Sequence, residues 1–463
     1  MTGRTGSRRW SALSLAVLAS ACGPAAIDEG ALLSAADARR NEAGSSAAPM
    51  TNDLRVLLSR PLTAESAAQV ALVNNRGVRA VIEELGIAEA RATQARRLPN
   101  PTLEGAMRFE GEGRPELEVG AMIDVTDLVL LATRASAAGA EVEAAKLSAV
   151  GALLDLAYDT RRAFYVHQAS AELTELRRTV LRAFTASADL ATRLREAGNI
   201  TELDLANQRS LFEEARLELQ AAELAAATDR ERLNVLMGLW GRGTRWQTTP
   251  RLPQIPAREL GLDELEAKAI ARSLDLAIAR QRFEGAAKRA NAASAQGWLP
   301  ELKAGVSAER SDEWAVGPAV EIEVPLFYQG QGETGVAQSE MRQQRHRYAD
   351  VAVALRASAR SAVVQLAAKR ETLLYYERVL LPLKQQVVDQ SQLEYNAMLI
   401  GLFQLLQAKR DQVQTAAAYV EHQRDYWIAR TNAEQLLAGR RPPESVTGDT
   451  RSTAPTQAVE GSH

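Results

Sequence analysis

Hydrophobic and polar residues alternate in steps of two along two stretches of the chain, residues 101–126 and 301–326. A turn rich in Gly, Ser, Asp or Glu divides each stretch near its middle. A period of two with one apolar and one polar face predicts a hairpin of two β-strands in each stretch. Such hairpins suit either a soluble sheet packed on a helix or a share of a membrane barrel with a wet interior. In the second stretch the apolar face consists of Leu302, Ala304, Val306, Ala308, Trp314, Val316, Pro318, Val320, Ile322 and Val324.

The opposite face of these predicted strands is strongly charged, as the lining of a water-filled lumen would be. Charged residues along a pore can tune its ion preference, or they can simply keep the lumen wet. Both interpretations stay open at the level of the sequence. The candidate lumen residues are Glu104, Arg108, Glu118, Asp124, Lys303, Glu321 and Glu323, together with Glu110 and Glu116.

Long stretches with apolar residues at every third or fourth position follow each hairpin and predict unusually long helices. They span about residues 132–197 and 201–237 in the first half, and 334–396 and 402–437 in the second. A helix of ~65 residues would extend on the order of 100 Å. Pro382 is expected to kink the third of these helices. The predicted fold class is therefore mainly α with a small β part, built from long coiled-coil hairpins and four strands.

The same order of elements occurs twice, which predicts an internal two-fold repeat. Leu98-Pro99 and Leu299-Pro300 each end a helical stretch and open a hairpin, at an offset of 201 residues. A shorter helix pair precedes each hairpin, over residues 63–97 and 262–296. We expect one repeat over 63–250, with its strands at 101–126 and long helices at 132–238. The second covers 251–439, with strands at 301–326 and long helices at 334–437.

The two ends of the chain have compositions of their own. Three arginines, an apolar run over residues 10–18 and the small residues 19–21 predict a secretory signal peptide over residues 1–21. Cys22 directly follows and resembles the lipidated cysteine of a bacterial lipobox. Residues 22–62 show no clear period and are expected to form a lipid-anchored linker, and 440–463 a disordered tail. No later apolar run approaches the ~20 residues of a spanning helix, so we expect no membrane helix.

Two turns join the long helices at corresponding places, at an offset of 200 residues. In the first turn Thr201 and Asp204 are spaced as an approximate capping box. These turns are either simple helix-hairpin connections or the docking tips for a partner, and the residues leave both open. The candidate tip residues are Gly198, Thr201 and Asp204 in the first turn, and Tyr395, Met398, Gly401 and Gln404 in the second.

Composition argues against most other function classes. The net charge of −3 gives no basic surface for nucleic acid, and one cysteine allows no disulfide framework. The four histidines stand at no ligand spacing, and we expect His167 and His422 on helix surfaces. The sequence contains no phosphate loop or nucleophile motif. We therefore expect neither an enzyme nor a cofactor or metal site.

Four strands are too few to close a barrel, because membrane barrels begin at about eight. Open strand edges are prohibitive in lipid, where backbone groups find no water partner. The strands are thus expected to form either a barrel shared among copies or a soluble sheet. Three copies would give 3 × 4 = 12 strands. Trp298, Phe327 and Tyr328 would then form an interfacial aromatic belt, or otherwise pack between hairpin and helices. The alternative is a lipid-anchored periplasmic coiled-coil scaffold or adaptor.

The order of parts, the Leu-Pro openings, the stretch Val-Glu-Ile-Glu-Val-Pro-Leu-Phe-Tyr-Gln-Gly (residues 320–330) and the two tips resemble the TolC family of outer membrane efflux proteins. The resemblance covers about residues 60–440, and Cys22 points to its lipoprotein branch. It implies a homotrimer in the outer membrane whose twelve-stranded barrel continues as a helical tunnel through the periplasm. It also implies a membrane-fusion adaptor and an inner-membrane transporter as partners, with heavy-metal ions or drugs as the exported solutes.

The resemblance at the tips is uneven. Gly198 and Asp204 match the family pattern of the first tip, and Tyr395 matches that of the second. The second tip departs from the family at Met398, where a Gly is expected, and at Gln404, where an acid is expected. These departures make the second tip more apolar and argue against a charged lock there. The stretch from Tyr395 to Gly401 resembles a subgroup associated with heavy-metal export.

Overall fold

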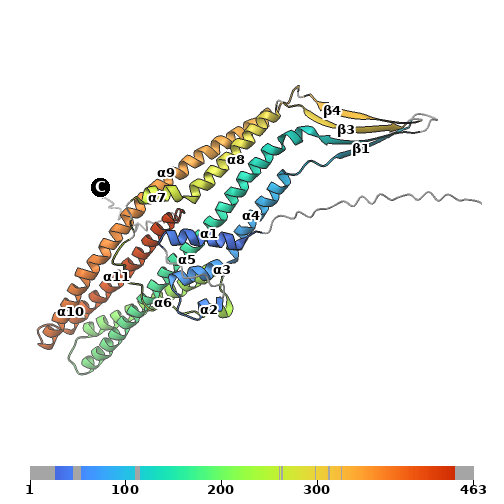
Figure 1. The fold of residues 1–463 in the computed structure, drawn as a ribbon. Helices are drawn as coiled ribbons and strands as arrows, with labels where there is room; N and C mark the ends of the chain where they lie inside the picture. The colour runs from blue at the N-terminus through green and yellow to red at the C-terminus, as the bar shows by residue number, and fades with distance from the viewer. Residues whose placement is uncertain are drawn as a thin grey trace, which may run out of the picture.

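The computed structural model describes residues 27–44, 54–109, 115–259, 261, 264–297, 299–310, 313–324 and 326–443. The molecule is elongated, with all strands at one end and two helical hairpin tips at the other (Figure 1). The predicted signal peptide, Cys22, Glu110 and Trp298 lie outside the described residues.

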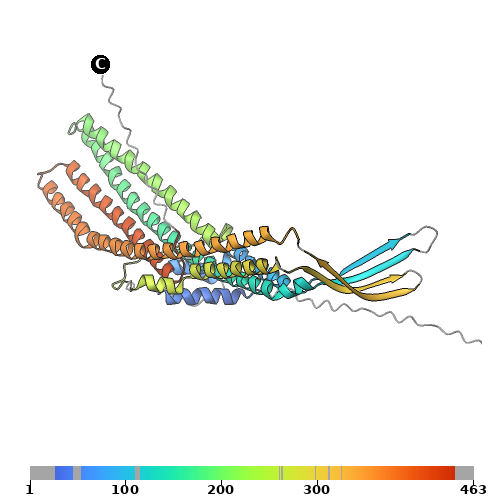
Figure 2. The same ribbon diagram turned by 90° about the horizontal axis from the view of Figure 1, so that it is seen from above.

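The strands form one antiparallel sheet in the order β1-β2-β3-β4. These are β1 (Thr102–Arg108), β2 (Glu116–Asp124), β3 (Glu301–Arg310) and β4 (Trp314–Glu323). The two hairpins lie beside each other and extend away from the helices as one curved ribbon (Figure 2). The sheet thus joins two parts of the chain that are almost 200 residues apart, through the pairing of β2 with β3.

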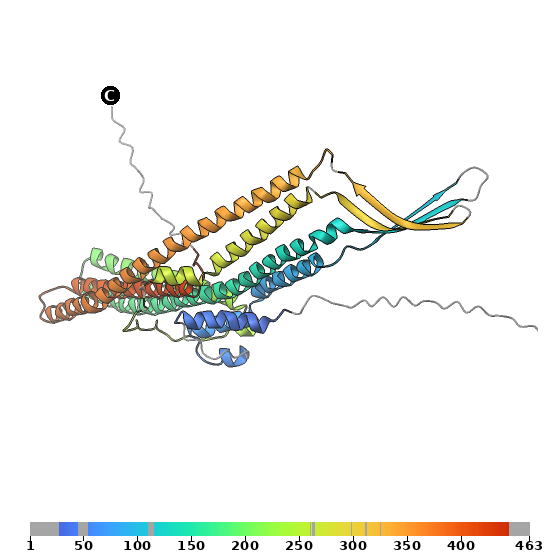
Figure 3. The ribbon, with the colours of Figure 1, turned by 45° about the horizontal axis from the view of Figure 1, so that its top comes forward.

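Four helices continue these strands in the same lateral order (Figure 3). They are α4 (Arg76–Ala95), α5 (Val125–Glu196), α8 (Leu274–Gln296) and α9 (Gln331–Tyr375). Helix α4 packs on α5, α5 on α8, and α8 on α9, so the helices form one curved layer. In this layer α4 and α9 are the two edge helices, as β1 and β4 are the edge strands. We call it the four-helix layer.

The long helical hairpins extend from this layer to the far end of the molecule. Helix α5 pairs with α6 (Glu202–Met237), and α10 (Leu381–Asn396) pairs with α11 (Leu402–Leu437). Between α9 and α10 a π-helical turn, η2 (Tyr376–Leu380), stands directly before Pro382. Proline has no N–H to donate to the preceding turn, and the wider π-turn absorbs that missing bond without ending the helix.

Shorter elements surround the middle of the molecule. They are α1 (Glu29–Glu42), α2 (Leu54–Leu58), α3 (Ala64–Asn74), α7 (Leu265–Arg272) and η1 (Gly241–Thr244). The largest cluster of buried apolar side chains lies here, where α1, α3 and α11 pack on α5. The two predicted short helix pairs correspond to α3–α4 and α7–α8, and Asn75 and Ser273 cap the second helix of each pair.

Helix α1 lies within the stretch 22–62 that was expected to be a linker, and it packs on the body of the protein. Asp28 caps its first turn, accepting from the N–H of Ala31, and the helix buries Leu32, Ala36 and Arg40 against the core. The apolar stripe is short and includes an arginine, so no hydrophobic period is visible in the sequence. The tertiary partner of Arg40, a carboxylate from α3, is what makes this burial favourable.

A buried ionic network fixes these elements to one another. Arg40 of α1 pairs with Glu65 of α3, and Glu65 also lies 3.8 Å from Arg161 of α5. Arg161 donates to Glu434 of α11 over 2.6 Å, and Arg430 contacts the same carboxylate at 3.0 Å. Removing one member of such a network leaves a buried charge unpaired, which typically costs about 3–5 kcal/mol.

His167 does not lie on a helix surface as expected, because it is buried in the same middle part of the molecule as this ionic network. Its ring meets the edge of Trp246 with the centroids 5.2 Å apart. Burial is the largest cause of its lowered pKa, followed by the nearby charge of Arg230. His422 is half-buried and lies against Tyr376 at 4.8 Å. Neither position could be read from helical periodicity, since both depend on aromatic side chains from other segments.

The continuous helix Gln331–Asn396 is long and apolar enough to cross a membrane by length and composition, with a mean hydropathy of 1.3 over its most apolar 18 residues. No such helix was expected from the length of the apolar runs in the sequence. Ala and Val account for the apolar character, and the helix also carries Arg356 and Arg360, which face Glu266 of α7 at 3.9 and 3.4 Å. The composition alone is weak support for a membrane span.

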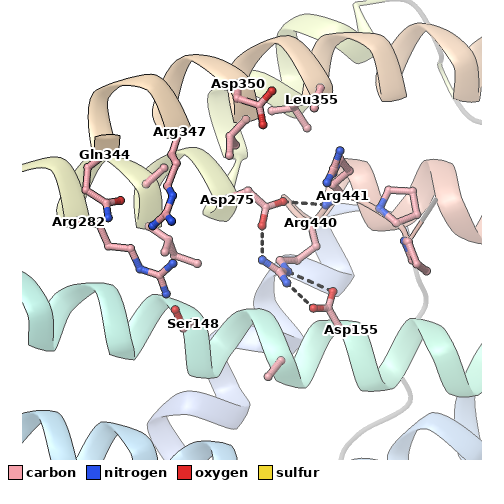
Figure 4. Close-up of a pocket in the computed structure, with 17 residues that line it drawn as sticks. Ser148, Asp155, Asp275, Arg282, Gln344, Arg347, Asp350, Leu355, Arg440 and Arg441 are labelled. Carbon is pink, nitrogen blue, oxygen red and sulfur yellow. Dashed lines mark hydrogen bonds and ion pairs between the residues drawn. The ribbon is translucent and has the colours of Figure 1, made fainter. Parts of the chain in front are cut away.

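The start of the expected disordered tail is fixed to the body of the protein. The guanidinium of Arg440 pairs with both Asp155 of α5 and Asp275 of α8 (Figure 4). The next N–H, that of Arg441, donates to Asp275 over 2.9 Å. The chain is therefore held as far as residue 441, and residues 444–463 lie outside the described part.

Candidate functional site: the sheet and the helical tips

The pairing register places the predicted lumen residues on one face of the sheet. Asp124, Lys303 and Glu321 are direct neighbours across β2, β3 and β4. Lys303 Nζ lies 3.1 Å from Glu321 Oε1. In antiparallel strands directly paired residues point to the same face. By the same register Glu104, Arg108, Glu118 and Glu323 share this face with those three residues.

This polar face is acidic. Two of its cross-strand pairs join like charges, Glu118 with Glu309 and Glu301 with Glu323. Like charges directly opposite each other destabilise a sheet, unless water or ions screen them. The face is therefore suited to an aqueous environment with mobile cations. Within the described residues no group of three or more His, Cys, Asp or Glu side chains is arranged to hold a metal ion.

The other face is apolar and largely exposed. Leu103 is 83% exposed and Val316 is 74% exposed, and Val119, Val306, Val320 and Ile322 are also open. A contiguous exposed apolar surface on a polar-backed sheet marks a site for membrane or protein contact. These exposures, taken over the described residues, leave the face available to a partner.

Within the part of the chain that the structure describes, both edges of the sheet are open, since β1 and β4 each pair on one side only. An exposed edge presents a row of unpaired N–H and C=O groups that can pair with another strand. Between the hairpins, Gly305 lets β3 approach β2 closely, because a Cβ there would collide with the backbone of Ala121. The inner strands β2 and β3 thus pack closely, while the outer edges of β1 and β4 remain available for pairing with another strand.

The aromatic residues next to β4 are exposed: Phe327 by 95% and Tyr328 by 62%. They do not pack between the hairpin and the helices, which was the alternative to an interfacial belt. The predicted belt itself remains a prediction.

The first helical tip joins α5 to α6 and is well capped. Gly198 takes the left-handed conformation with φ +78°, and the N–H of Asn199 donates to the carbonyl of Leu194 over 2.8 Å. This pattern is a Schellman motif. Thr201 and Asp204 then form a reciprocal capping box, with bonds of 3.0 and 3.1 Å. The predicted capping box is confirmed.

The second tip joins α10 to α11 and has the same backbone path with different residues. Met398 holds the left-handed conformation, with φ +60°, and the N–H of Leu399 donates to the carbonyl of Glu394 over 2.9 Å. At the start of α11 the amide oxygen of Gln404 accepts from the N–H of Gly401 at 3.3 Å. Gly401 has no side chain to return a bond, so only half of a capping box exists here.

The second tip also exposes large apolar side chains. Met398 is 92% and Leu399 is 75% exposed, whereas the corresponding residues of the first tip are Gly198 and Asn199. Leu399 was not among the predicted tip residues, although a leucine in a turn between two polar helix ends is a usable signal. Tyr395 contributes to the turn through its carbonyl, which accepts from the N–H of Met398 over 2.9 Å.

Comparison with known proteins finds several that resemble this chain in sequence or in fold. The cobalt-zinc-cadmium resistance protein CzcC of Cupriavidus metallidurans is 24% identical over 385 residues, which cover 81% of this chain and 90% of CzcC. The structure of CusC matches with a TM-score of 0.66 and 17% identity, over 81% of this chain and 92% of that one. The outer membrane protein VceC of Vibrio cholerae matches with a TM-score of 0.68 and 16% identity, over 82% and 96%. No family model matches the chain.

The chain therefore has the fold of an outer membrane channel protein. The predicted resemblance to the TolC family of outer membrane efflux proteins is confirmed at the level of the fold.

Proposed function

We propose that the protein is the outer membrane channel of a tripartite efflux system. Three copies close a twelve-stranded barrel in the outer membrane, and their four-helix layers continue it as a tunnel through the periplasm. The channel is a passive conduit and no enzyme, and its inner-membrane transporter supplies the energy. A cleaved signal peptide over residues 1–21 and acylation of Cys22 hold the mature chain at the membrane before the barrel closes.

One observation carries this proposal: a sheet with two open edges and an exposed apolar face is continued strand by strand by a layer of helices. Open strand edges are prohibitive in lipid, and a large exposed apolar face is unfavourable in water. A barrel shared among copies in a membrane meets both demands, because each β4 pairs with the β1 of the next copy and the apolar face contacts lipid. The halves 63–250 and 251–439 each supply two strands and two layer helices, so we treat them as repeats of one unit.

The acidic face lines the lumen in this arrangement. The residues Glu104, Arg108, Glu118, Asp124, Lys303, Glu321 and Glu323 would face water there, and the apolar face would contact lipid. The similarity to CzcC, a cobalt-zinc-cadmium resistance protein, favours heavy-metal ions as the solutes. An acidic lumen attracts cations without selecting among them, so selection would lie with the inner-membrane transporter.

Conductance of the purified protein in a planar bilayer tests the channel directly. Wild type should give large, cation-preferring pores, and a variant with Glu118, Glu321 and Glu323 changed to Gln should keep the pore size and lose part of the preference. Absence of pores from correctly assembled protein would contradict the channel. An unchanged ion preference in the Gln variant would mean that the acidic face does not line the lumen.

We further propose that the two tips dock a periplasmic membrane-fusion adaptor, through Gly198, Thr201 and Asp204 in one and Tyr395, Met398, Gly401 and Gln404 in the other. Gly401 is the cleaner position for a test, because its φ is −79° and a Cβ there meets no atom within 4 Å. Gly401→Trp should therefore leave the turn intact and abolish crosslinking to the adaptor. Crosslinking at the wild-type level would show that this tip is only a turn.

A further inference from the structure

The segment that follows α11 is held in a gap that the fold leaves for it. Gly439 takes the left-handed conformation, with φ +95°, and a Cβ there would collide with the carbonyl oxygen of Arg272. The guanidinium of Arg440 lies over Gly151 of α5, where a Cβ would come within 3.1 Å of it. Glycine destabilises the interior of a helix relative to alanine. The space at Gly151 therefore has a structural use, because it admits the Arg440 side chain.

This segment enters a cavity between three helices. The cavity has a volume of about 780 Å³ and is lined by residues of α5, α8 and α9 together with residues 440–443 (Figure 4). Arg440 lies at one end of it, paired with Asp155 and Asp275. Pro442 and Pro443 also line the cavity, and proline restricts the backbone to an extended path. The described part of the chain thus reaches residue 443 inside the cavity.

The other end of the cavity carries positive charge. The side chains of Arg282 of α8 and Arg347 of α9 both extend into it, near Gln344 (Figure 4). Neither guanidinium forms an ion pair with any residue that the structure describes. Asp350, which also lines the cavity one turn along α9, makes no ion pair with Arg347. Two guanidiniums that share one cavity repel each other unless an anion lies between them, so this end is suited to a carboxylate.

A second groove continues the first cavity towards the strands. It has a volume of about 580 Å³ and shares Ser148, Arg282 and Gln344 with the first cavity. It is lined by α4, α5 and α8 and extends along α8 as far as Arg289. From Asp275 to that residue the path measures ~20 Å at the usual rise per residue. The two spaces together leave room for several extended residues beyond Pro443.

The chain that follows Pro443 has the matching charge. Residues 444–463 contain the acids Glu444, Asp449 and Glu460, against Arg451. Along α8 the positive end of the cavity lies ~10 Å from the Arg440 anchor, and an extended chain covers that distance in about three to four residues. Glu444 is the fourth residue after Arg440. Its carboxylate is therefore within reach of both guanidiniums.

We propose that residues 444–449 lie along this groove, with the carboxylate of Glu444 bound between Arg282 and Arg347. The segment is then a strap that joins α8 and α9 to α5 midway along the four-helix layer. Helices α5 and α9 are the two that lead from the sheet to the helical tips, so the strap ties the two halves of the chain together away from the sheet. The strap lies within one chain and does not depend on the proposed channel.

Crosslinking of the full mature protein tests where the segment lies. Val446→Cys combined with Gln344→Cys should be joined within one chain by a short bismaleimide, at least tenfold faster than the matched control. That control combines Val446→Cys with Arg342→Cys, at an exposed position about 200° around α9 from Gln344. Mapping of the linked peptides identifies the product. Each single variant controls for bonds to Cys22, the only natural cysteine.

Hydrogen exchange tests the electrostatic part of the strap. Glu444→Lys/Asp449→Lys should raise the exchange rate of the α9 amides 344–355 by roughly two- to fivefold at low salt, and less at high salt. Glu444→Asp keeps the charge and should remain close to wild type. Arg282→Glu/Arg347→Glu should act like the first pair, and the four reversals combined should return the rate towards wild type. The amides of the first tip serve as the reference for correct folding.

Other occupants of the groove give different results. A crosslink that joins two chains, seen in mixtures of tagged and untagged protein, would assign the groove to a second copy and overturn the strap. Absence of the crosslink, with citrate slowing exchange equally in wild type and in Glu444→Lys/Asp449→Lys, would show a site for free anions instead. Exchange that none of the reversals changes would show that Arg282 and Arg347 hold no carboxylate.

Discussion

The two helical tips share one backbone geometry and differ in how the sequence supports it. Each ends its first helix with a Schellman motif, and the N-cap residue of the second helix stands three residues after a left-handed residue. The first tip meets these demands with Gly198 and a complete capping box. The second places Met398 in the left-handed conformation and keeps half a cap. A left-handed non-glycine residue is strained, and such strain persists where the surroundings or the function require it.

The two tips therefore differ in backbone strain and in the apolar surface that they expose. In the first tip the Schellman motif and the capping box satisfy the backbone groups of the turn, and Leu203 is its exposed large apolar side chain. The second tip contains a strained left-handed residue and exposes two large apolar side chains, Met398 and Leu399, at the end of the molecule. We interpret the second tip as the main apolar anchor for the adaptor, and the first as a rigid guide beside it. Four changes at the tips test this comparison, and each is best followed by hydrogen exchange of the tip amides, which reports local opening.

Gly198→Met should have the largest effect, because it forces a left-handed side chain on the relaxed tip. The expected loss is about 1–2 kcal/mol of local opening free energy at the amides of residues 199–204. The built-in control is position 398, where the same residue already stands in the same conformation. Unchanged protection at the first tip would mean that the left-handed conformation carries no strain in this turn.

Thr201→Ala should come next. It removes the hydroxyl that accepts from the N–H of Asp204, and losing such a cap typically costs about 1 kcal/mol. Thr201→Ser keeps the hydroxyl and should remain close to wild type. Equal exchange in the Ala and Ser variants would show that the capping box does not stabilise the tip.

Met398→Gly should act in the opposite direction and stabilise the second tip by roughly 0.5–1 kcal/mol, since glycine adopts a left-handed φ without a steric penalty. The same change removes an exposed apolar side chain and should weaken adaptor crosslinking. Greater stability together with weaker crosslinking is the signature of a residue kept for binding. A variant that is stabilised and still crosslinks fully would refute the role of Met398 as an anchor.

The smallest effect concerns pH. The Thr201 hydroxyl and backbone N–H donate to the carboxylate of Asp204, and these hydrogen bonds lower its pKa. A carboxyl with a folded pKa below its unfolded value stabilises above the unfolded pKa and loses that contribution as the pH falls through the folded one. Protection of the first tip should therefore decline in acid below about pH 4. The second tip, with Gln404 in place of an acid, should show no such decline, and Asp204→Asn should make the two tips alike.

Much of this architecture could be predicted from the sequence, because its signals are local. The strand faces follow from alternation, so the register placed Lys303 and Glu321 together as expected. The long helices and the Thr201–Asp204 cap follow from periodicity and spacing. The features that could not be predicted depend on residues that are distant in the sequence. Helix α1 needs the carboxylate of Glu65 to bury Arg40, and no local pattern shows that pairing.

The second tip illustrates a different limit. A methionine gives no local sign of a left-handed backbone, and propensity argues against one. The only sequence signal was the position of Met398, 200 residues after Gly198 in the corresponding turn. The burial of His167 against Trp246 was likewise hidden, because the tryptophan comes from an irregular segment that no periodicity places.

The central claim, that copies of this chain share one barrel, is tested most directly by the native mass and shape of the mature protein. The measurement combines light scattering with negative-stain images of protein extracted by detergent from the outer membrane fraction. The account predicts three chains in a long tube whose ends are the sheet and the tips. A monomer or dimer that leaves the membrane without detergent, once its lipid anchor is removed, would contradict it.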